Sequence, residues 1–293
     1  MKGVLVVIIL NDELLITNCL LMKDDDLLQF LYGTTLGRVI LRILVSPWLS
    51  SLVGKFLDTR LSTVLIKSFV LNNDINLIEF EDKKYKSFND FFTREKLNKE
   101  IDNDSNSFIC PCDGHLSAYK IEENSTFKIK NSIYTVESLI KDKELAKKYI
   151  GGYCLIFRLS PNDYHRYCYI DNGTKSSNNF IKGILHSVRG VAVENYKVFQ
   201  TNSREWSILE TENFGNVIQI EVGALLVGKI NNYHDEYNFM RGEEKGKFEY
   251  GGSTIVLLVE ANKVNIYQYI LNNSKKDKET FVTIGKRIGS KIN

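Results

Sequence analysis

The stretch Gly251-Gly252-Ser253-Thr254 contains the residues whose types and order most directly suggest chemistry. It follows a polar segment at 241–248 and precedes the apolar run Ile255–Val259. Because glycine tolerates positive φ without steric penalty, the two glycines taken alone are typical of a tight β-hairpin turn. The same order also places a serine hydroxyl next to a glycine carbonyl that no side chain shields. The alternative interpretation is a peptide bond that the chain itself cleaves.

Five further segments occur in a definite order along the chain. They are Ser87-Phe88-Asn89-Asp90-Phe91-Phe92-Thr93-Arg94, Cys110-Pro111-Cys112-Asp113-Gly114, Leu159-Ser160-Pro161-Asn162-Asp163-Tyr164-His165-Arg166, Val222-Gly223-Ala224-Leu225-Leu226-Val227-Gly228 and Gly242-Glu243-Glu244-Lys245-Gly246-Lys247-Phe248. Together with the glycine–serine stretch they resemble the motifs of the phosphatidylserine decarboxylases. The resemblance extends over residues 27–289 and favours self-cleavage over a hairpin turn.

Members of this family are made as proenzymes, and the resemblance implies cleavage of the peptide bond between Gly252 and Ser253. Attack of the Ser253 hydroxyl on the Gly252 carbonyl gives an ester, and elimination then leaves dehydroalanine at the new terminus. Hydrolysis of that residue yields a pyruvoyl group, a covalent cofactor that serves as an electron sink as pyridoxal phosphate does elsewhere. We therefore expect a large chain of residues 1–252 and a small chain of residues 253–293.

A neutral serine is a weak nucleophile, so the fold has to supply a base. In Asp-His-Ser arrangements a carboxylate orients the imidazole that takes the hydroxyl proton. By that analogy the catalytic candidates are Asp113, His165 and Ser253. Asp113 taken alone is an ordinary Asp-Gly turn residue. His165 is also the candidate proton donor in decarboxylation, since an imidazole titrates at about pH 6.5.

The sequence departs from the family at a position that bears on the base. Many members carry Tyr-His-Arg-x-His, whereas this chain reads Tyr164-His165-Arg166-Tyr167-Cys168. Either His165 serves both reactions, or another group replaces the second histidine. Cys168 is then a buried packing residue or, alternatively, a thiol proton donor. His115, two residues after Asp113, is the reserve imidazole.

The charge and cysteine content exclude other classes of function. Lysine plus arginine number 38 and aspartate plus glutamate 36, and this balance gives no overall field that would favour nucleic acid. The five cysteines show no repeating disulfide or zinc spacing, which favours a reduced, cytoplasmic compartment. Cys110 and Cys112 supply only two ligands where a structural zinc site needs four, so no metal is expected.

The front of the chain has helical periodicity. Apolar residues recur at helical spacing from Leu28 to Leu44, after an acidic cluster at 24–26 and before Pro47, which bounds the pattern. A second helical stretch runs from Leu61 to Phe69. The segment Leu27–Leu57 contains three bases and no acid. It either lies on an anionic bilayer, where each base contributes about 1 kcal/mol, or packs its apolar face on the core.

The rest of the chain is β-rich. The polar segment Asn98–Ser107 reads as a loop, and beyond it short apolar runs such as Val217–Ile220, Ala224–Ile230 and Ile255–Val259 alternate with Gly and Asn turns. We expect an α+β fold with a helical, membrane-contacting region over residues 1–97 and a mainly antiparallel β catalytic body over residues 98–293. An apolar run at 4–10 is too short to span a bilayer and indicates a buried strand or a weak anchor.

The resemblance implies a carboxy-lyase that converts phosphatidylserine into phosphatidylethanolamine and CO₂. It also implies a peripheral protein of the cytoplasmic membrane that contacts an anionic surface. Enzymes of this family are often homodimers, so self-association is among the expected partnerships. The alternatives are a pyruvoyl decarboxylase of another serine-headed lipid or of a free aromatic amino acid, and an unprocessed, non-catalytic lipid-binding relative.

Overall fold

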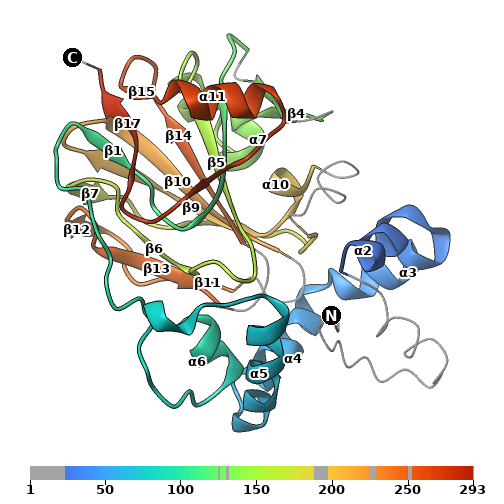
Figure 1. Cartoon of the computed structure of the whole chain (residues 1–293). Coiled ribbons are helices and arrows are strands. Elements are labelled where there is room, and N and C mark those ends of the chain that lie inside the picture. The colour runs from blue at the N-terminus through green and yellow to red at the C-terminus, as the bar shows by residue number, and fades with distance from the viewer. Residues whose placement is uncertain are drawn as a thin grey trace.

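The computed structural model describes residues 24–124, 126–129, 132–187, 197–224, 229–249 and 253–292. The apolar run at 4–10 and the glycines 251 and 252 lie outside these ranges. Within them, helices come first and antiparallel strands follow, which confirms the predicted α+β fold (Figure 1). The domain boundary at residue 97 stays a prediction.

The helical region has more breaks than its apolar pattern predicts. Its elements are α2 (Asp24–Gly33), α3 (Thr35–Leu44), α4 (Pro47–Leu57), η1 (Arg60–Thr63), α5 (Val64–Asn72), η2 (Leu77–Glu79) and α6 (Phe88–Phe92). The pattern from Leu28 to Leu44 is divided at Gly33, after which the Thr34 hydroxyl caps α3 by accepting the N–H of Gly37 at 2.9 Å. Pro47 ends that pattern but also begins α4, because the first helical turn needs no N–H at that position.

A nine-stranded sheet forms the centre of the body, and its strand pairs are all antiparallel. Its order is β12-β7-β9-β10-β14-β5-β2-β16, with β8 against β9. The strands are β2 (Gly114–Lys120), β5 (Tyr153–Leu159), β7 (Gly173–Lys175), β8 (Asn179–Ile181), β9 (Arg204–Thr211), β10 (Gly215–Gly223), β12 (Tyr237–Phe239), β14 (Ser253–Val259) and β16 (Thr280–Val282). The predicted strands at 217–220 and 255–259 are confirmed within β10 and β14. Of the run at 224–230, residues 225–228 lie outside the described ranges.

Smaller sheets and short helices complete the body. The smaller sheets are β11 (Ile230–Asn232), β13 (Glu244–Phe248) and β6 (Arg166–Cys168); β1 (Ser107–Ile109), β17 (Arg287–Lys291) and β15 (Val264–Ile266); and β3 (Thr126–Ile129) with β4 (Ser132–Thr135). The helices are α7 (Val136–Ile140), α8 (Lys143–Lys147), α10 (Val198–Thr201) and α11 (Gln268–Lys275). The sheet of β11, β13 and β6 lies at the end of the body that faces the helical region (Figure 1).

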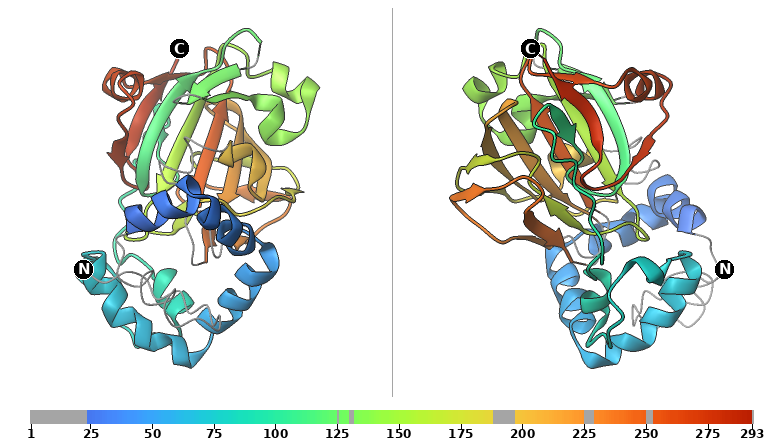
Figure 2. Two further views of the ribbon diagram at one scale, coloured as in Figure 1. Left: turned by 90° about the vertical axis from the view of Figure 1, so that its right-hand side faces the viewer. Right: turned by 60° about the vertical axis from the view of Figure 1, so that its left-hand side comes forward.

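The apolar core has three parts. Side chains alternate across a strand, so Val256 and Leu258 of β14 pack in one cluster with α2 and α3, while Ile255 and Leu257 pack in a second cluster on the other face. The third cluster joins the helical region to the body, and its members include Phe80, Phe88, Phe91, Phe92, Tyr164, Cys168 and Ile284. The helical region curves along that end of the body (Figure 2). This third cluster adjoins the candidate active site, because Phe92 stacks on His165.

Candidate active site

Ser253 and His165 lie in contact where the nine-stranded sheet faces the sheet of β11, β13 and β6. Ser253 is the first residue of β14, fully buried, and it pairs with Gly223 on β10 and Leu159 on β5. His165 directly precedes β6, and its carbonyl accepts the N–H of Phe248 at the end of β13. The Nδ1 atom of His165 lies 3.2 Å from the Oγ atom of Ser253. The fold therefore brings the candidate nucleophile and the candidate base into hydrogen-bonding contact.

A backbone carbonyl orients the imidazole. The Nε2 atom of His165 lies 3.1 Å from the carbonyl oxygen of Ser160. A carbonyl only accepts hydrogen bonds, so Nε2 carries the ring proton of the neutral imidazole and Nδ1 is left to accept the Ser253 hydroxyl. The Asp163 carboxylate fixes this turn by accepting the Ser160 N–H at 2.6 Å. The Ser160 carbonyl thus holds the place that an Asp-His-Ser triad gives to a carboxylate.

The surroundings of His165 keep its ring uncharged. Burial, assisted by the nearby Arg94 guanidinium, lowers the pKa of His165 to about 3, against the opposing hydrogen bonds from the Ser160 and Pro161 backbone. The ring of Phe92 stacks on the imidazole, with centroids 4.0 Å apart and planes at 28°. At neutral pH the imidazole is therefore in the state in which Nδ1 accepts a proton.

Asp113 is buried but binds groups other than His165. One carboxylate oxygen lies 2.5 Å from the Nζ atom of Lys96, and the other accepts the N–H of Ile284 at 2.9 Å. Asp113 lies beside the end of β5, because the next residue, Gly114, approaches that strand closely. A Cβ atom on Gly114 would lie 2.8 Å from the carbonyl oxygen of Arg158. The predicted orienting contact from Asp113 to His165 is not among the hydrogen bonds of the described residues, so a catalytic role for Asp113 stays a proposal.

Comparison with known proteins identifies the family. The sequence model of phosphatidylserine decarboxylase matches residues 88–290. The chain belongs to the phosphatidylserine decarboxylase family. The phosphatidylserine decarboxylase proenzyme 2 of Clostridium acetobutylicum is 44% identical over 265 residues, which cover 89% of this chain and 91% of that protein. The phosphatidylserine decarboxylase proenzymes of Clostridium novyi and Clostridium beijerinckii are 40% and 39% identical over 92% and 93% of this chain, and 95% of each relative is covered.

Two side chains were candidates to replace the second histidine of the decarboxylase motif. Cys168 is buried on β6, its N–H donates to the Pro111 carbonyl at 2.8 Å, and burial raises the pKa of its thiol. His115 lies on β2 with its ring centroid 5.6 Å from that of Phe281. In the sheet, β5 separates β2 from β14. Within the described ranges, neither side chain hydrogen-bonds to Ser253 or His165.

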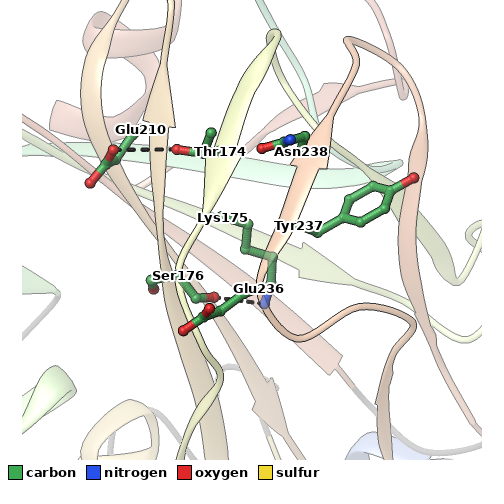
Figure 3. A pocket seen from close by; sticks show the side chains of 7 residues that line it. All are labelled: Thr174, Lys175, Ser176, Glu210, Glu236, Tyr237 and Asn238. Atoms are coloured by element: carbon green, nitrogen blue, oxygen red, sulfur yellow. Dashed lines mark hydrogen bonds between the residues drawn. The ribbon is translucent and has the colours of Figure 1, made fainter.

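This decarboxylase also has a cavity away from Ser253 and His165. Within the described parts of the chain, no group of three or more His, Cys, Asp or Glu side chains is arranged to hold a metal ion. A cavity of about 270 Å³ lies beside β7 and β12, where Thr174 donates to Glu210 (Figure 3). Burial lowers the pKa of Lys175, which lines it, to about 8. Since β9 and β10 separate β7 from β14, this cavity is distinct from the candidate active site.

Some residues of the site were not singled out from the sequence. Phe92 and Arg94 belong to a motif that was recognised as a whole, and an aromatic pair followed by an arginine was the available signal for them. The contact of the Ser160 carbonyl cannot be predicted from residue type, because every residue has a backbone carbonyl. Lys96 lies just outside the motif, and nothing in its spacing indicates a contact with Asp113.

Proposed function

We propose that this protein is a phosphatidylserine decarboxylase made as a proenzyme, which cleaves itself between Gly252 and Ser253. The 3.2 Å contact between His165 Nδ1 and Ser253 Oγ carries this proposal, in a chain that aligns with relatives named proenzymes over most of its length. The products are a chain of residues 1–252 and a chain of residues 253–293.

The cleavage step follows from the protonation states of the pair. Nδ1 of His165 takes the hydroxyl proton while the Ser160 carbonyl holds Nε2–H. The Ser253 oxygen bonds to the Gly252 carbonyl carbon, the C–N bond breaks, and the departing amine takes the proton from the imidazole. Elimination then releases the Gly252 carboxylate and leaves dehydroalanine, and water replaces its nitrogen, which leaves as ammonia. General-base assistance of this kind is worth about 10² to 10⁴ in rate.

The surroundings of Ser253 fit a pyruvoyl group. Residue 253 is held on both sides by β10 and β5, and it is fully buried with an imidazole as its hydrogen-bonding partner. A pyruvoyl group here would supply an electrophilic carbonyl for the substrate amine and an electron sink for decarboxylation. His165 would hold the proton that returns to carbon. Cys168 is assigned to packing, because a buried thiol with a raised pKa is a poor proton donor.

We assign membrane contact to the outer face of α3 and α4. Leu31, Leu41 and Leu44 pack on the core. By contrast, Leu36 and Val39 are each 55% exposed. Exposed bases accompany these apolar side chains, namely Arg38, Arg42 and Lys55. Apolar and basic side chains together suit the surface of an anionic bilayer. On this proposal the two alternatives drawn from the sequence apply to opposite faces of the same segment.

No helix of the described ranges is long and apolar enough to cross a bilayer. The proposal is accordingly a peripheral attachment at the cytoplasmic membrane, with phosphatidylserine as substrate. Self-association as a homodimer stays a prediction.

Intact-mass measurement of the purified full chain tests the proposal. The expected result is two masses under denaturing conditions, with the shorter chain beginning at residue 253 and carrying a ketone instead of an amine. Release of CO₂ from phosphatidylserine, from an ether-lipid analogue and from tryptophan is then compared. One uncleaved mass in folded protein would contradict self-processing, and preference for tryptophan would contradict the lipid substrate.

A further inference from the structure

A buried ion pair joins the two sheets that carry the candidate nucleophile and base. The Nζ atom of Lys245 on β13 lies 2.8 Å from the Oε1 atom of Glu221 on β10, and both side chains are fully buried. β10 is hydrogen-bonded to β14, which begins at Ser253, and β13 is hydrogen-bonded to β6, which begins directly after His165. The pair therefore links the sheet of the hydroxyl to the sheet of the imidazole.

An irregularity in β13 directs the lysine toward this contact. Glu244 pairs with Cys168 and Gly246 with Tyr167, so the register shifts and Lys245 has no partner of its own on β6. A Cβ atom at Gly246 would clash with the backbone carbonyl oxygen of Asn231 and lie 2.7 Å from the Tyr167 hydroxyl, which explains glycine there. Bulges of this kind re-aim a side chain and are frequent next to active sites.

Further hydrogen bonds surround the pair and involve side chains of β6, β9 and β11. Lys245 also donates to Asn232 Oδ1 at 2.7 Å, and Asn232 donates to Glu205 at 2.7 Å and to Glu221 at 3.2 Å. Tyr167, two residues after His165, donates to the same Asn232 oxygen at 3.1 Å. The ammonium thus has two directional partners, and the strand that follows His165 is tied to them.

We propose that Lys245 and Glu221 are positioning residues for self-cleavage. Their directional contact sets the distance between the sheet that carries His165 and the sheet that carries Ser253. This inference rests on the proposed function. A buried ion pair adds little stability compared with an apolar pair of the same size. We infer that the role of this pair is instead to fix one arrangement of β10 and β13. A displacement of about 1 Å in the reacting groups costs up to about a hundredfold in rate.

The test replaces both charges with apolar side chains of similar size. Lys245→Met combined with Glu221→Met is expected to fold, with a Tm close to that of the wild type. Its self-cleavage, followed by intact mass after synthesis in a cell-free system, is expected to slow by about tenfold to a hundredfold. A folded double variant that cleaves at the wild-type rate would show that the pair serves stability alone, and the inference would be wrong.

Arg241→Met combined with Asp171→Met is the matched control. These residues also form a buried ion pair, with their side chains 7% and 1% exposed, and neither lies in β10 or β13. The control is expected to cleave at the wild-type rate even where its Tm falls. If it slows as much as the double variant, the effect belongs to buried ion pairs in general and the inference fails.

A second variant decides the question if the double variant does not fold. Lys245→Gln combined with Glu221→Leu removes both charges and the contact between them, and the glutamine amide can still donate to Asn232 Oδ1, which Lys245 contacts at 2.7 Å. Severalfold slower cleavage supports the inference, and wild-type cleavage overturns it. The wild type is measured first, because an uncleaved wild-type chain defeats the proposed function itself, whereas a cleaving wild type with unaffected variants defeats this inference alone.

Discussion

The β body and the helical region use apolar residues in opposite ways. All seven residues of β14 are buried, and they fix Ser253 at the start of a strand that is paired on both sides. In the helical region, Leu61, Val64 and Ile78 are 74%, 77% and 86% exposed. Large apolar side chains that are exposed to this extent are typical of a surface that binds a membrane or another protein. The difference supports the proposed division of tasks, with the nucleophile and base in the body and attachment at the exposed side chains of the helical region.

The largest effect expected in the body is that of Ser253→Ala. Removal of the hydroxyl removes the nucleophile, so we expect a single uncleaved chain by intact mass and no release of CO₂. Thr254→Val is the neighbouring control, because alternation along β14 turns that hydroxyl to the opposite face. Normal cleavage in Ser253→Ala would show that the cleavage site lies at another peptide bond, and the assignment of chemistry to β14 would be wrong.

His165→Gln is expected to slow self-cleavage by about 10² to 10⁴, since glutamine keeps the size of the side chain but not its basicity. The rate is measured by intact mass during cell-free synthesis. His115→Gln is measured in parallel and decides between the two imidazoles. Slow cleavage in His115→Gln with normal cleavage in His165→Gln would transfer the role of base to His115.

Lys245→Met alone is expected to destabilise the body strongly. It leaves the Glu221 carboxylate buried without its cation, which costs about 3–5 kcal/mol. Denaturant unfolding of the precursor measures this loss. A change below 1 kcal/mol, on the scale of about one hydrogen bond, would mean that water reaches Glu221.

Substitutions in the helical region are expected to change attachment and not cleavage. Leu36→Ser combined with Val39→Ser removes two exposed apolar side chains, and full burial of each would contribute about 1.5–3 kcal/mol. Binding to vesicles that contain phosphatidylserine should therefore fall by at least about tenfold in co-sedimentation. Slower self-cleavage in this variant would break the proposed separation of tasks.

The smallest effect expected is that of pH. The pKa of His165 is depressed in the folded chain, so its imidazole stays neutral as the pH falls through its ordinary value of 6.5. Self-cleavage should then stay level between about pH 8 and pH 5. Between the two pKa values the unfolded chain binds a proton that the folded chain does not, so stability falls as the pH falls through this window. His165→Gln should reduce that part of the pH dependence of unfolding, and an unchanged profile would mean that His165 is solvated.

The contacts of the site differ in how far the sequence predicts them. Ser253 and His165 belong to motifs with recognisable residue types, and the apolar runs of β10 and β14 predict the strands that hold Ser253. The Ser160 carbonyl and the Lys96 contact with Asp113 depend on where the chain turns, which residue type does not specify.

Two other features, the helix break at Gly33 and the buried charge of Glu221, are indicated by residue types in the sequence but were not predicted. Gly33-Thr34 is a helix breaker followed by a capping residue, but the apolar spacing continues across it, so one helix was predicted where there are two. Glu221 lies in a stretch of β10 that is buried from residue 217 to residue 223, and a charge at such a position requires a partner. Its partner is Lys245, which lies beyond the next two strands along the chain and has no distinctive spacing.

The location of Ser253 at the start of β14 has a consequence for the products of cleavage. β14 lies between β10 and β5, β16 pairs with β2, and β17 pairs with β1, so each of these strands from the short product is hydrogen-bonded to the long one. The severed pieces would stay interleaved as a two-chain heteromer and come apart only in denaturant. Processing would therefore create a new chain end in the interior while the molecule keeps its outline and mass under native conditions.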